Sequence, residues 1–416
     1  MALLGRILEE QAGIRTRQKV RYAVIDTELP TKNDSKNDSK NDSKNDSKDD
    51  AVSAPAPKPG RASVGWGMWI IAAVIGVAAL FLSALALGRR DVSSGSSGSA
   101  RGSTSGAAAP KTASADATID FQAMPAAGWT PYDPTLKPAP GGTEHQLTMH
   151  ATEKVIEVAP GVTQQMWTFD DSVPGPALRG KVGDIFTVTL VNDGKLSHSL
   201  DFHASKVAWN VEMRSIKPGE SLVYQFTAKF AGAFMYHCGT APALHHIGNG
   251  MYGAIIIDPP VLAPVDHEYL LVQSEIYTGP QGQPGDLAKM INEKPDAVVF
   301  NGYASQYKFS PIRVEPNQRV RVWVVDAGPS ENSSFHIVGT IFDTVFKEGS
   351  YTLQPDARSG GSQALDLQPA QGGFVEFTLD AAGLYPIVTH KFANVGKGAL
   401  GLFQAGEVAT TTAAGH

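Results

Sequence analysis

The sequence predicts an all-β protein with two tandem Greek-key β-sandwich domains, preceded by a transmembrane helix and a disordered N-terminal tail. Three observations support this prediction. Short β-branched and aromatic runs separated by turn residues begin near residue 118, and a similar set of runs recurs after residue 260. A long uncharged run precedes both sets. The 42 Gly and 27 Pro among 416 residues favour many turns over long helices.

The uncharged run predicts a membrane anchor. Residues 62–88 hold no charged side chain and no His, between Arg61 and Arg89. About 20 apolar residues span a bilayer, so we expect a single transmembrane helix here. A cleaved signal peptide is the alternative, but the 61-residue leader and the full-length apolar run fit one badly. Basic residues flank the run on both sides and therefore do not set its orientation.

The segments around this helix have biased compositions. Residues 1–61 include repeated Lys-Asn-Asp-Ser units, which cannot bury apolar surface and predict a disordered, low-complexity cytoplasmic tail. Residues 89–117 are rich in Ser, Gly and Ala and predict a flexible linker.

The strand-like runs divide the remaining chain into two domains. The run at 185–191 has a counterpart at 319–325, and turn residues separate such runs from their neighbours. This repetition predicts a first sandwich at 118–260 and a second at 261–410.

Composition excludes several functions. The one cysteine, Cys238, rules out an internal disulfide framework and every metal site that needs several thiolates. A net charge of −6 gives no electrostatic support to nucleic-acid binding. The chemistry of this chain therefore depends on its histidines and this thiol.

Side-chain alternation in strands predicts two separate sites. His198 and His203 are an odd number of positions apart, so they point to opposite faces of a strand, whereas Asp201 shares the face of His203. His237 and Cys238 are consecutive and must also diverge. If the two segments are neighbours, one face collects His198 and Cys238, and the other collects Asp201, His203 and His237.

The first of these faces holds a complete copper donor set. Cys238 is followed by His246 and Met251 in a Cys-x7-His-x4-Met frame. A thiolate, two imidazoles and a weak thioether are the ligands of trigonal blue-copper sites. His245 competes with His246, but only His246 keeps the four-residue gap to Met251. The alternative, an inert buried thiol among surface histidines, does not explain why all four residues occur together.

These motifs resemble those of a known family. The spacing His198-x-x-Asp201-x-His203, followed by Tyr236-His-Cys238 and by His246 to Met251, resembles the copper-containing nitrite reductases. These are two-domain cupredoxin proteins of the multicopper oxidase superfamily. The later segments Ser334-Phe-His-Ile-Val-Gly339 and Tyr385 to His390 resemble the second-domain segments of the family.

The resemblance implies two copper sites per chain, in a homotrimer. The implied type 1 copper ligands are His198, Cys238, His246 and Met251. The implied type 2 copper ligands are His203 and His237 of one protomer with His390 of the next. The residues implied to transfer protons are Asp201 and His336. Val338 occupies a position where many members carry Ile, which would enlarge the pocket above the copper.

The resemblance also implies an activity and its partners. Nitrite would be reduced to nitric oxide, with electrons from a small cupredoxin or cytochrome c. The expected protein is anchored in the cell membrane by a single pass through residues 62–88, with its catalytic domains outside the cytoplasm.

Two alternative functions differ in their copper chemistry. A laccase-like oxidase needs a trinuclear cluster built largely from His-x-His pairs, and this sequence contains none. An electron carrier or copper-binding protein without catalysis needs only the type 1 ligands. Copper content distinguishes an electron carrier from a reductase, because a carrier holds one copper per chain and a reductase holds two.

Overall fold

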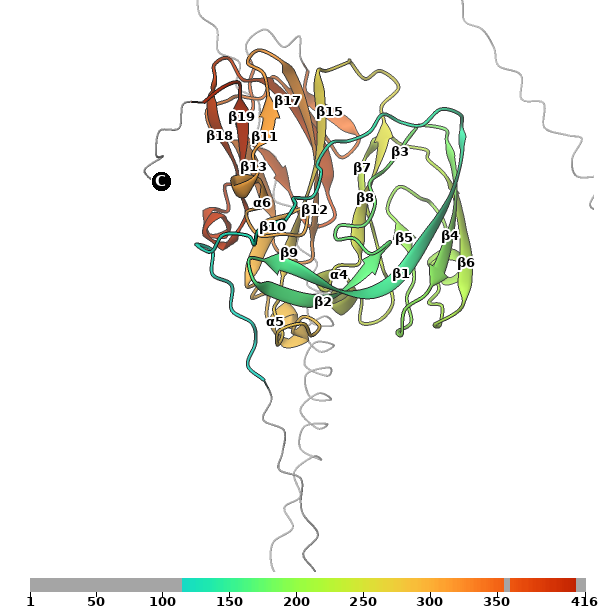
Figure 1. Cartoon of the computed structure of the whole chain (residues 1–416). Helices are drawn as coiled ribbons and strands as arrows, with labels where there is room; N and C mark the ends of the chain where they lie inside the picture. The colour runs from blue at the N-terminus through green and yellow to red at the C-terminus, as the bar shows by residue number, and fades with distance from the viewer. Residues whose placement is uncertain (1–113, 355–359, 409–416) are drawn as a thin grey trace, which may run out of the picture. The chain divides into compact units, whose positions relative to one another are not determined.

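The computed structural model describes residues 114–354 and 360–408, which form two β-sandwiches (Figure 1). This confirms the all-β prediction, and the helices in this part have four to six residues. The predicted tail, the transmembrane helix at 62–88 and most of the linker lie outside the described residues. No helix among the described residues is long and apolar enough to cross a membrane.

The first sandwich has two four-stranded sheets. One sheet contains, in spatial order, β2 (Val162–Phe169), β1 (Glu144–Ala159), β4 (Ile185–Asn192) and β6 (Ser221–Thr227). The other contains β3 (Leu178–Lys181), β8 (Tyr252–Asp258), β7 (Gly232–His237) and β5 (Asp201–Phe202). The short helices are α3 (Trp209–Glu212) and α4 (Ala243–Gly248).

The second sandwich is larger. Its six-stranded sheet contains β10 (Ala297–Phe300), β9 (His267–Ile276), β12 (Arg319–Gly328), β17 (Gly372–Thr378), β14 (Thr344–Lys347) and β15 (Ser350–Leu353). Its five-stranded sheet contains β11 (Ile312–Val314), β19 (Leu400–Ala405), β18 (Gly383–Thr389), β13 (Ser333–Ile337) and β16 (Leu365–Leu367). The short helices are α5 (Leu287–Ile291), α6 (Gln306–Phe309) and the 3₁₀ turn η2 (Phe392–Lys397).

Alternation explains why residues 185–192 form strand β4 of the first sandwich. In β4, Phe186, Val188 and Leu190 are buried, whereas the threonines between them are half-buried. This period of two is typical of a strand with one face on a core and the other toward solvent. The buried face packs against residues of β5 and β8, such as Phe202 and Ile255, to form the core of this sandwich.

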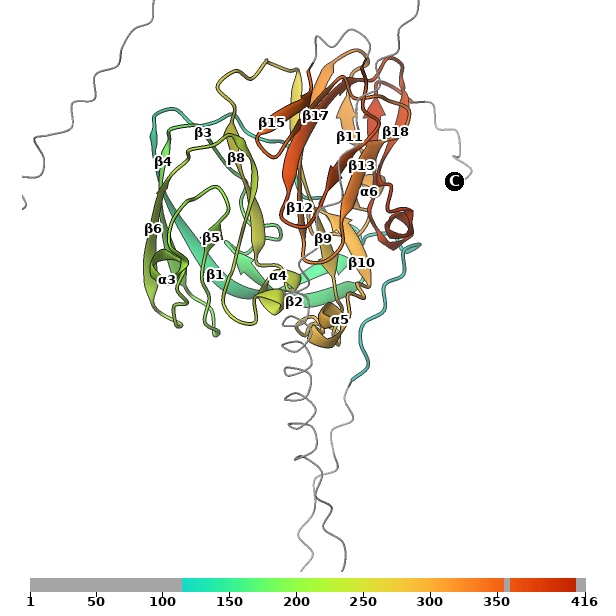
Figure 2. The ribbon, with the colours of Figure 1, turned by 180° about the vertical axis from the view of Figure 1, so that it is seen from behind.

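A second apolar core lies between the two sandwiches. Strand β7 contacts β12 and β17. Figure 1 labels β7, and Figure 2 shows its neighbour β8 on the side of the first sandwich that faces the second. Small residues of β7 and β8, including Ala233 and Ala254, pack with the aromatic rings of Trp323 and Phe374. A Cβ on Gly372 would lie 2.2 Å from the carbonyl oxygen of Ala233, so the strands approach this closely only because residue 372 is Gly.

A buried ion-pair network also joins the sandwiches. The Arg179 guanidinium on β3 forms two parallel hydrogen bonds to Glu268 on β9, at 2.8 and 3.0 Å, and a third to Asp258 at 2.9 Å. Arg321 on β12 bonds to the same Glu268 and to Glu376. Arg179 and Arg321 are only 9% and 2% exposed. The network therefore fixes β3 of one sandwich against β9 of the other.

The segment before β1, drawn in teal in Figure 1, is bonded to the second sandwich before it enters the first. The Ala117 N–H donates to the Gly279 carbonyl at 2.8 Å, and the Leu136 N–H donates to the Glu268 carbonyl at 2.9 Å. Asp116 pairs with Lys289 at 3.1 Å. Ordered contacts with the second sandwich thus begin before residue 118.

Candidate metal centres

His198, Cys238 and His246 form a compact buried cluster. His198 lies between β4 and β5, Cys238 directly follows β7, and His246 belongs to α4. The two Nδ1 atoms are 3.3 Å apart. The Cys238 Sγ atom is 3.3 Å from Nδ1 of His246 and 4.0 Å from Nδ1 of His198. Three donor atoms therefore face a common point.

This cluster fits a copper ion. Donors about 2 Å from a metal and 120° apart lie about 3.5 Å from one another, close to the observed triangle. One thiolate and two imidazoles are also the soft donor set that copper selects. Met251 is fully buried in the same core. Its backbone bonds to Cys238 and His246, at 3.1 and 3.0 Å, and so ties the ligand segments together.

The surroundings keep these donor groups available. The Ser199 N–H donates to the Cys238 Sγ atom at 3.3 Å. Burial lowers the pKa of His198, and burial together with the neighbouring His198 lowers the pKa of His246 to about 4. Both imidazoles are therefore neutral near pH 7, which is the state that binds a metal.

Asp201, His203 and His237 form a second cluster on the other face. Asp201 of β5 is directly opposite His237 of β7 in the antiparallel ladder. The Nε2 atoms of His203 and His237 are 3.0 Å apart, and Oδ2 of Asp201 is 3.8 Å from Nε2 of His237. The Nδ1–H of His237 donates to the Cys238 carbonyl at 3.0 Å. The lone pair of His237 is therefore on Nε2, facing His203.

One peptide bond separates the two clusters. The Cys238 side chain belongs to the core of the first sandwich. The His237 side chain points the opposite way, with its Nε2 in the second cluster. This division is the one that side-chain alternation predicts from the sequence. Two imidazoles and a carboxylate can provide part of the ligand set of a metal ion, and they leave coordination positions open for further ligands.

The two second-domain histidines that the family resemblance singles out, His336 and His390, lie together but belong to neither cluster. His336 of β13 and His390, which follows β18, have ring centroids 5.0 Å apart. His336 Nδ1 makes a short hydrogen bond to the Gln363 carbonyl. Within the described residues of one chain, no group of close donor atoms includes His336 or His390. His390 is exposed.

The spacing of the sequence motifs does not predict three residues that contact the donor residues of the first cluster. Glu153 contacts Nε2 of His198, Trp167 packs on the His246 ring, and Ser199 bonds to Cys238. Glu153 and Trp167 are opposite each other in the β1–β2 ladder. Their shared position becomes visible only when the hairpin register is known.

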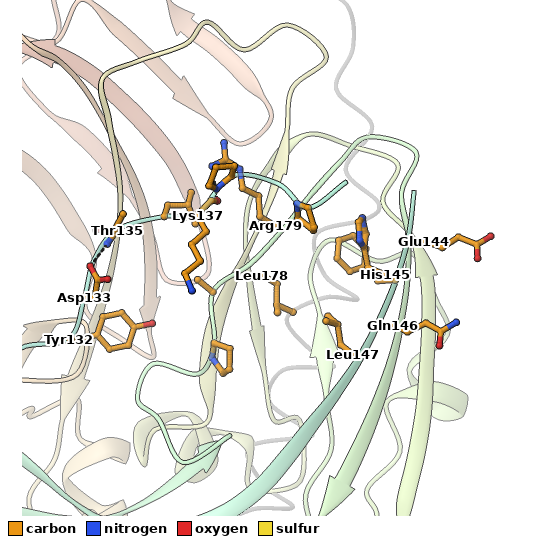
Figure 3. A pocket seen from close by; sticks show the side chains of 16 residues that line it. Tyr132, Asp133, Thr135, Lys137, Glu144, His145, Gln146, Leu147, Leu178 and Arg179 are labelled. Carbon is orange, nitrogen blue, oxygen red and sulfur yellow. Dashed lines mark hydrogen bonds between the residues drawn. The ribbon is translucent and has the colours of Figure 1, made fainter. Parts of the chain in front are cut away.

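A separate cavity of about 800 Å³ lies at the other end of the first sandwich (Figure 3). Tyr132, Lys137, His145 and Arg179 are among its lining residues. His145 pairs with the buried Asp184 at 2.8 Å. The cavity lies at the start of β1 and β4, whereas His198 follows the end of β4. It belongs to neither donor cluster.

The fold and the donor clusters define a copper protein related to the multicopper oxidases, and the family model described as multicopper oxidase matches residues 150–261. The chain is 37% identical over 268 residues to the copper-containing nitrite reductase of Neisseria meningitidis serogroup A, covering 62% of this chain and 68% of that protein. Among solved structures, the copper nitrite reductase of Nitrosomonas europaea is 36% identical with a TM-score of 0.59, covering 64% of this chain and 94% of that one. The copper-containing nitrite reductase of Thermus scotoductus is 30% identical with a TM-score of 0.57, covering 63% and 62%. This chain therefore belongs to the family of copper-containing nitrite reductases.

Proposed function

We propose that this protein is a copper nitrite reductase, an oxidoreductase that converts nitrite to nitric oxide and water with one electron and two protons. The observation that carries the proposal is the His237-Cys238 pair, whose adjacent side chains enter two separate donor clusters. A reductase needs one centre that receives electrons and one that binds the anion. Family membership supports the same activity.

We assign the two clusters to different copper types. The type 1 ligands are His198, Cys238, His246 and Met251, which lie in the core of the first sandwich. The type 2 ligands are His203 and His237, completed by His390 from a neighbouring protomer. A single chain presents two facing imidazoles at one place and an exposed His390 at another, so each half needs a second copy.

Exposed apolar side chains of the second sandwich support association with a neighbouring protomer, and the family resemblance implies a homotrimer. Val338, Ile341 and Phe392 are 41%, 67% and 61% exposed. The ring of Phe392 lies 5.7 Å from that of His390. Burying exposed apolar side chains of this size against a partner stabilises the assembly. Association would therefore bury them and bring His336 beside the second cluster of the next protomer.

The residues of the second cluster can deliver protons. Copper held by these residues would supply the electron and polarise the N–O bond of nitrite. Asp201 shares the face of His203 and His237 and would hydrogen-bond the anion and donate one proton. The Gln363 carbonyl fixes Nδ1 of His336, so Nε2 is the atom that would transfer the second proton. The backbone between Cys238 and His237 would provide a short covalent route for the electron between the two clusters.

The electron donor and the location of the enzyme complete the proposal. We assign the donor to a small cupredoxin or cytochrome c that reduces the type 1 copper. The apolar run at 62–88 anchors the chain in the cell membrane, with the sandwiches outside the cytoplasm. Protease treatment of intact and disrupted spheroplasts tests this topology, because only external domains are cut in intact cells.

The direct test measures nitric oxide and copper on one sample. The copper-loaded full chain, solubilised in detergent, receives nitrite and a reduced dye without oxygen. We expect nitric oxide release at two coppers per chain. Two coppers without nitric oxide would indicate another substrate at the second cluster. One copper without nitric oxide would favour the alternative function, an electron carrier.

A further inference from the structure

We propose that Glu153 is the positioning residue of the first copper centre. Its carboxylate holds Nε2 of His198, so that Nδ1 faces the metal position, and its negative charge lowers the reduction potential of copper bound there. This inference rests on the proposed function, because it assigns a tuning group to the proposed type 1 centre.

The contact itself fixes which His198 nitrogen can bind a metal. Oε1 of Glu153 lies 3.4 Å from Nε2 of His198. An ionised carboxylate only accepts hydrogen bonds, so Nε2 carries the proton and Nδ1 keeps its lone pair. That Nδ1 is the atom that faces Cys238 and His246. Carboxylates that orient metal-bound imidazoles in this way increase the basicity of the ligand.

The carboxylate is held firmly in place. The Lys195 N–H donates to both oxygens of Glu153, at 2.9 Å each, and the Leu196 N–H donates to Oε1 at 3.1 Å. The side chain of Glu153 is 7% exposed. Residues 195 and 196 lead directly to His198, so the same carboxylate shapes the loop and orients the ligand at its end.

Gly194 makes room for this arrangement. A Cβ on Gly194 would lie 2.7 Å from Oε1 of Glu153 and 3.1 Å from its Cδ. The backbone of Gly194 is not in the left-handed region, so alanine meets no conformational barrier there. A methyl group at this position would instead push the carboxylate away from His198.

One residue pair of the β1–β2 ladder contacts both histidines of the first cluster. Glu153 is paired with Trp167 across the two strands, so their side chains lie on the same face. The Trp167 ring centroid is 4.6 Å from that of His246 and 6.3 Å from that of His198. Glu153 therefore acts on one imidazole while Trp167 packs against the other.

The charge of Glu153 has a definite effect on the redox equilibrium. A carboxylate beside a ligand stabilises the oxidised, more positive copper more than the reduced form. The first centre is buried, so solvent screens this interaction only weakly. A residue that only capped the loop would affect stability but not the reduction potential.

The test compares Glu153→Gln with Glu144→Gln in the copper-loaded full chain. Glutamine keeps a hydrogen-bond acceptor but removes the charge. Glu144 is exposed on the same strand at its far end, so its variant is the matched control. A redox titration of the thiolate absorption band should show an approximately tenfold shift toward reduced copper in Glu153→Gln, which is about 59 mV upward for one electron. A potential equal to that of Glu144→Gln overturns the inference.

Gly194→Ala provides a second route to the same result. It displaces the carboxylate without altering Glu153 or His198, and we expect an upward shift in potential and at least a tenfold weaker affinity for Cu(II). If Glu153→Gln does not fold, an unshifted potential in Gly194→Ala overturns the inference. If the copper-loaded native chain lacks a thiolate band, the type 1 assignment and this inference both fail. If the native band is present and neither variant shifts, only the role of Glu153 fails.

Discussion

At the scale of single residues, the second cluster combines two facing imidazoles with one carboxylate. His203 and His237 face each other through Nε2, whereas the Asp201 carboxylate lies 3.8 Å from His237. Asp201 can therefore be changed without removing an imidazole. His198 and Cys238 belong to the other cluster, so such a change removes no donor atom of the first centre.

We expect Asp201→Asn to retain two coppers per chain and to lose activity by about 10²- to 10⁴-fold. The amide can still hydrogen-bond nitrite, but it cannot donate the same proton. Anaerobic nitric oxide release, with copper measured on the same sample, checks this expectation. Full activity in the variant would remove Asp201 from the mechanism.

A buried acid in the second sandwich predicts a pH effect on stability. Burial first, with the nearby Glu275 and Glu331, raises the pKa of Asp326 well above its usual value of 3.8. Its Oδ2 atom has no hydrogen-bond partner among the described residues. The folded protein therefore keeps this proton at pH values where the unfolded chain has lost it. The stability that protonated Asp326 provides is complete below pH 3.8 and is lost as the pH rises toward the folded-state pKa.

Asp326→Asn should remove the fall in stability at high pH, because an amide stays neutral at every pH. We expect the variant to be about 1 to 3 kcal/mol more stable than the native protein at pH 8, with a difference that shrinks toward pH 4. Urea unfolding of the metal-free protein at both pH values measures it. A difference that does not change with pH would contradict the assignment.

At the scale of strands, alternation was predictable and pairing was not. The run at 185–191 became β4, in which every second residue is buried, and the run at 319–325 became most of β12, which is buried on both faces. Both runs are rich in β-branched residues, which is a local signal for a strand. The opposite faces of His237 and Cys238 follow from side-chain alternation, which is also a local rule. The contact between Glu153 and His198 joins residues 45 positions apart and depends on how β1 lies against a loop. Spacing along the chain carries no information about it.

The inter-sandwich core supplies a test at this scale. Gly372→Ala places a Cβ 2.2 Å from the Ala233 carbonyl oxygen, which is backbone and cannot swing away. We expect a loss of about 1 to 3 kcal/mol in the free energy of unfolding from overpacking. Gly396→Ala, where the new Cβ meets nothing within 4 Å, is the control. Equal denaturation midpoints for the two variants would contradict the close approach of β7 and β17.

At the scale of the whole described part, buried charge connects the two sandwiches. Arg179 makes contacts with Asp258 and Glu268 from opposite sides of the boundary. The two-sandwich division was visible in the sequence repetition, but this network was not, because its members come from strands scattered along the chain. Removing one partner of a buried pair leaves the other charge uncompensated.

We therefore expect Arg179→Met to lower the free energy of unfolding by about 3 to 5 kcal/mol. Arg313→Met removes an exposed arginine from β11 and should change it little. Chemical denaturation followed by circular dichroism compares the two. A similar small effect in both variants would show that the network does not hold the sandwiches together.

Strand β7 contributes both to the core between the sandwiches and to the donor clusters. Ala233 and Met235 of β7 contribute to the core between the sandwiches, and the same strand ends at His237, one residue before Cys238. Any shear between the sandwiches would therefore act on the strand whose end joins the two donor clusters. In the copper-loaded protein, we therefore expect the thiolate absorption band to change when a mutation alters the packing between the sandwiches. The change should be visible in variants that are still folded.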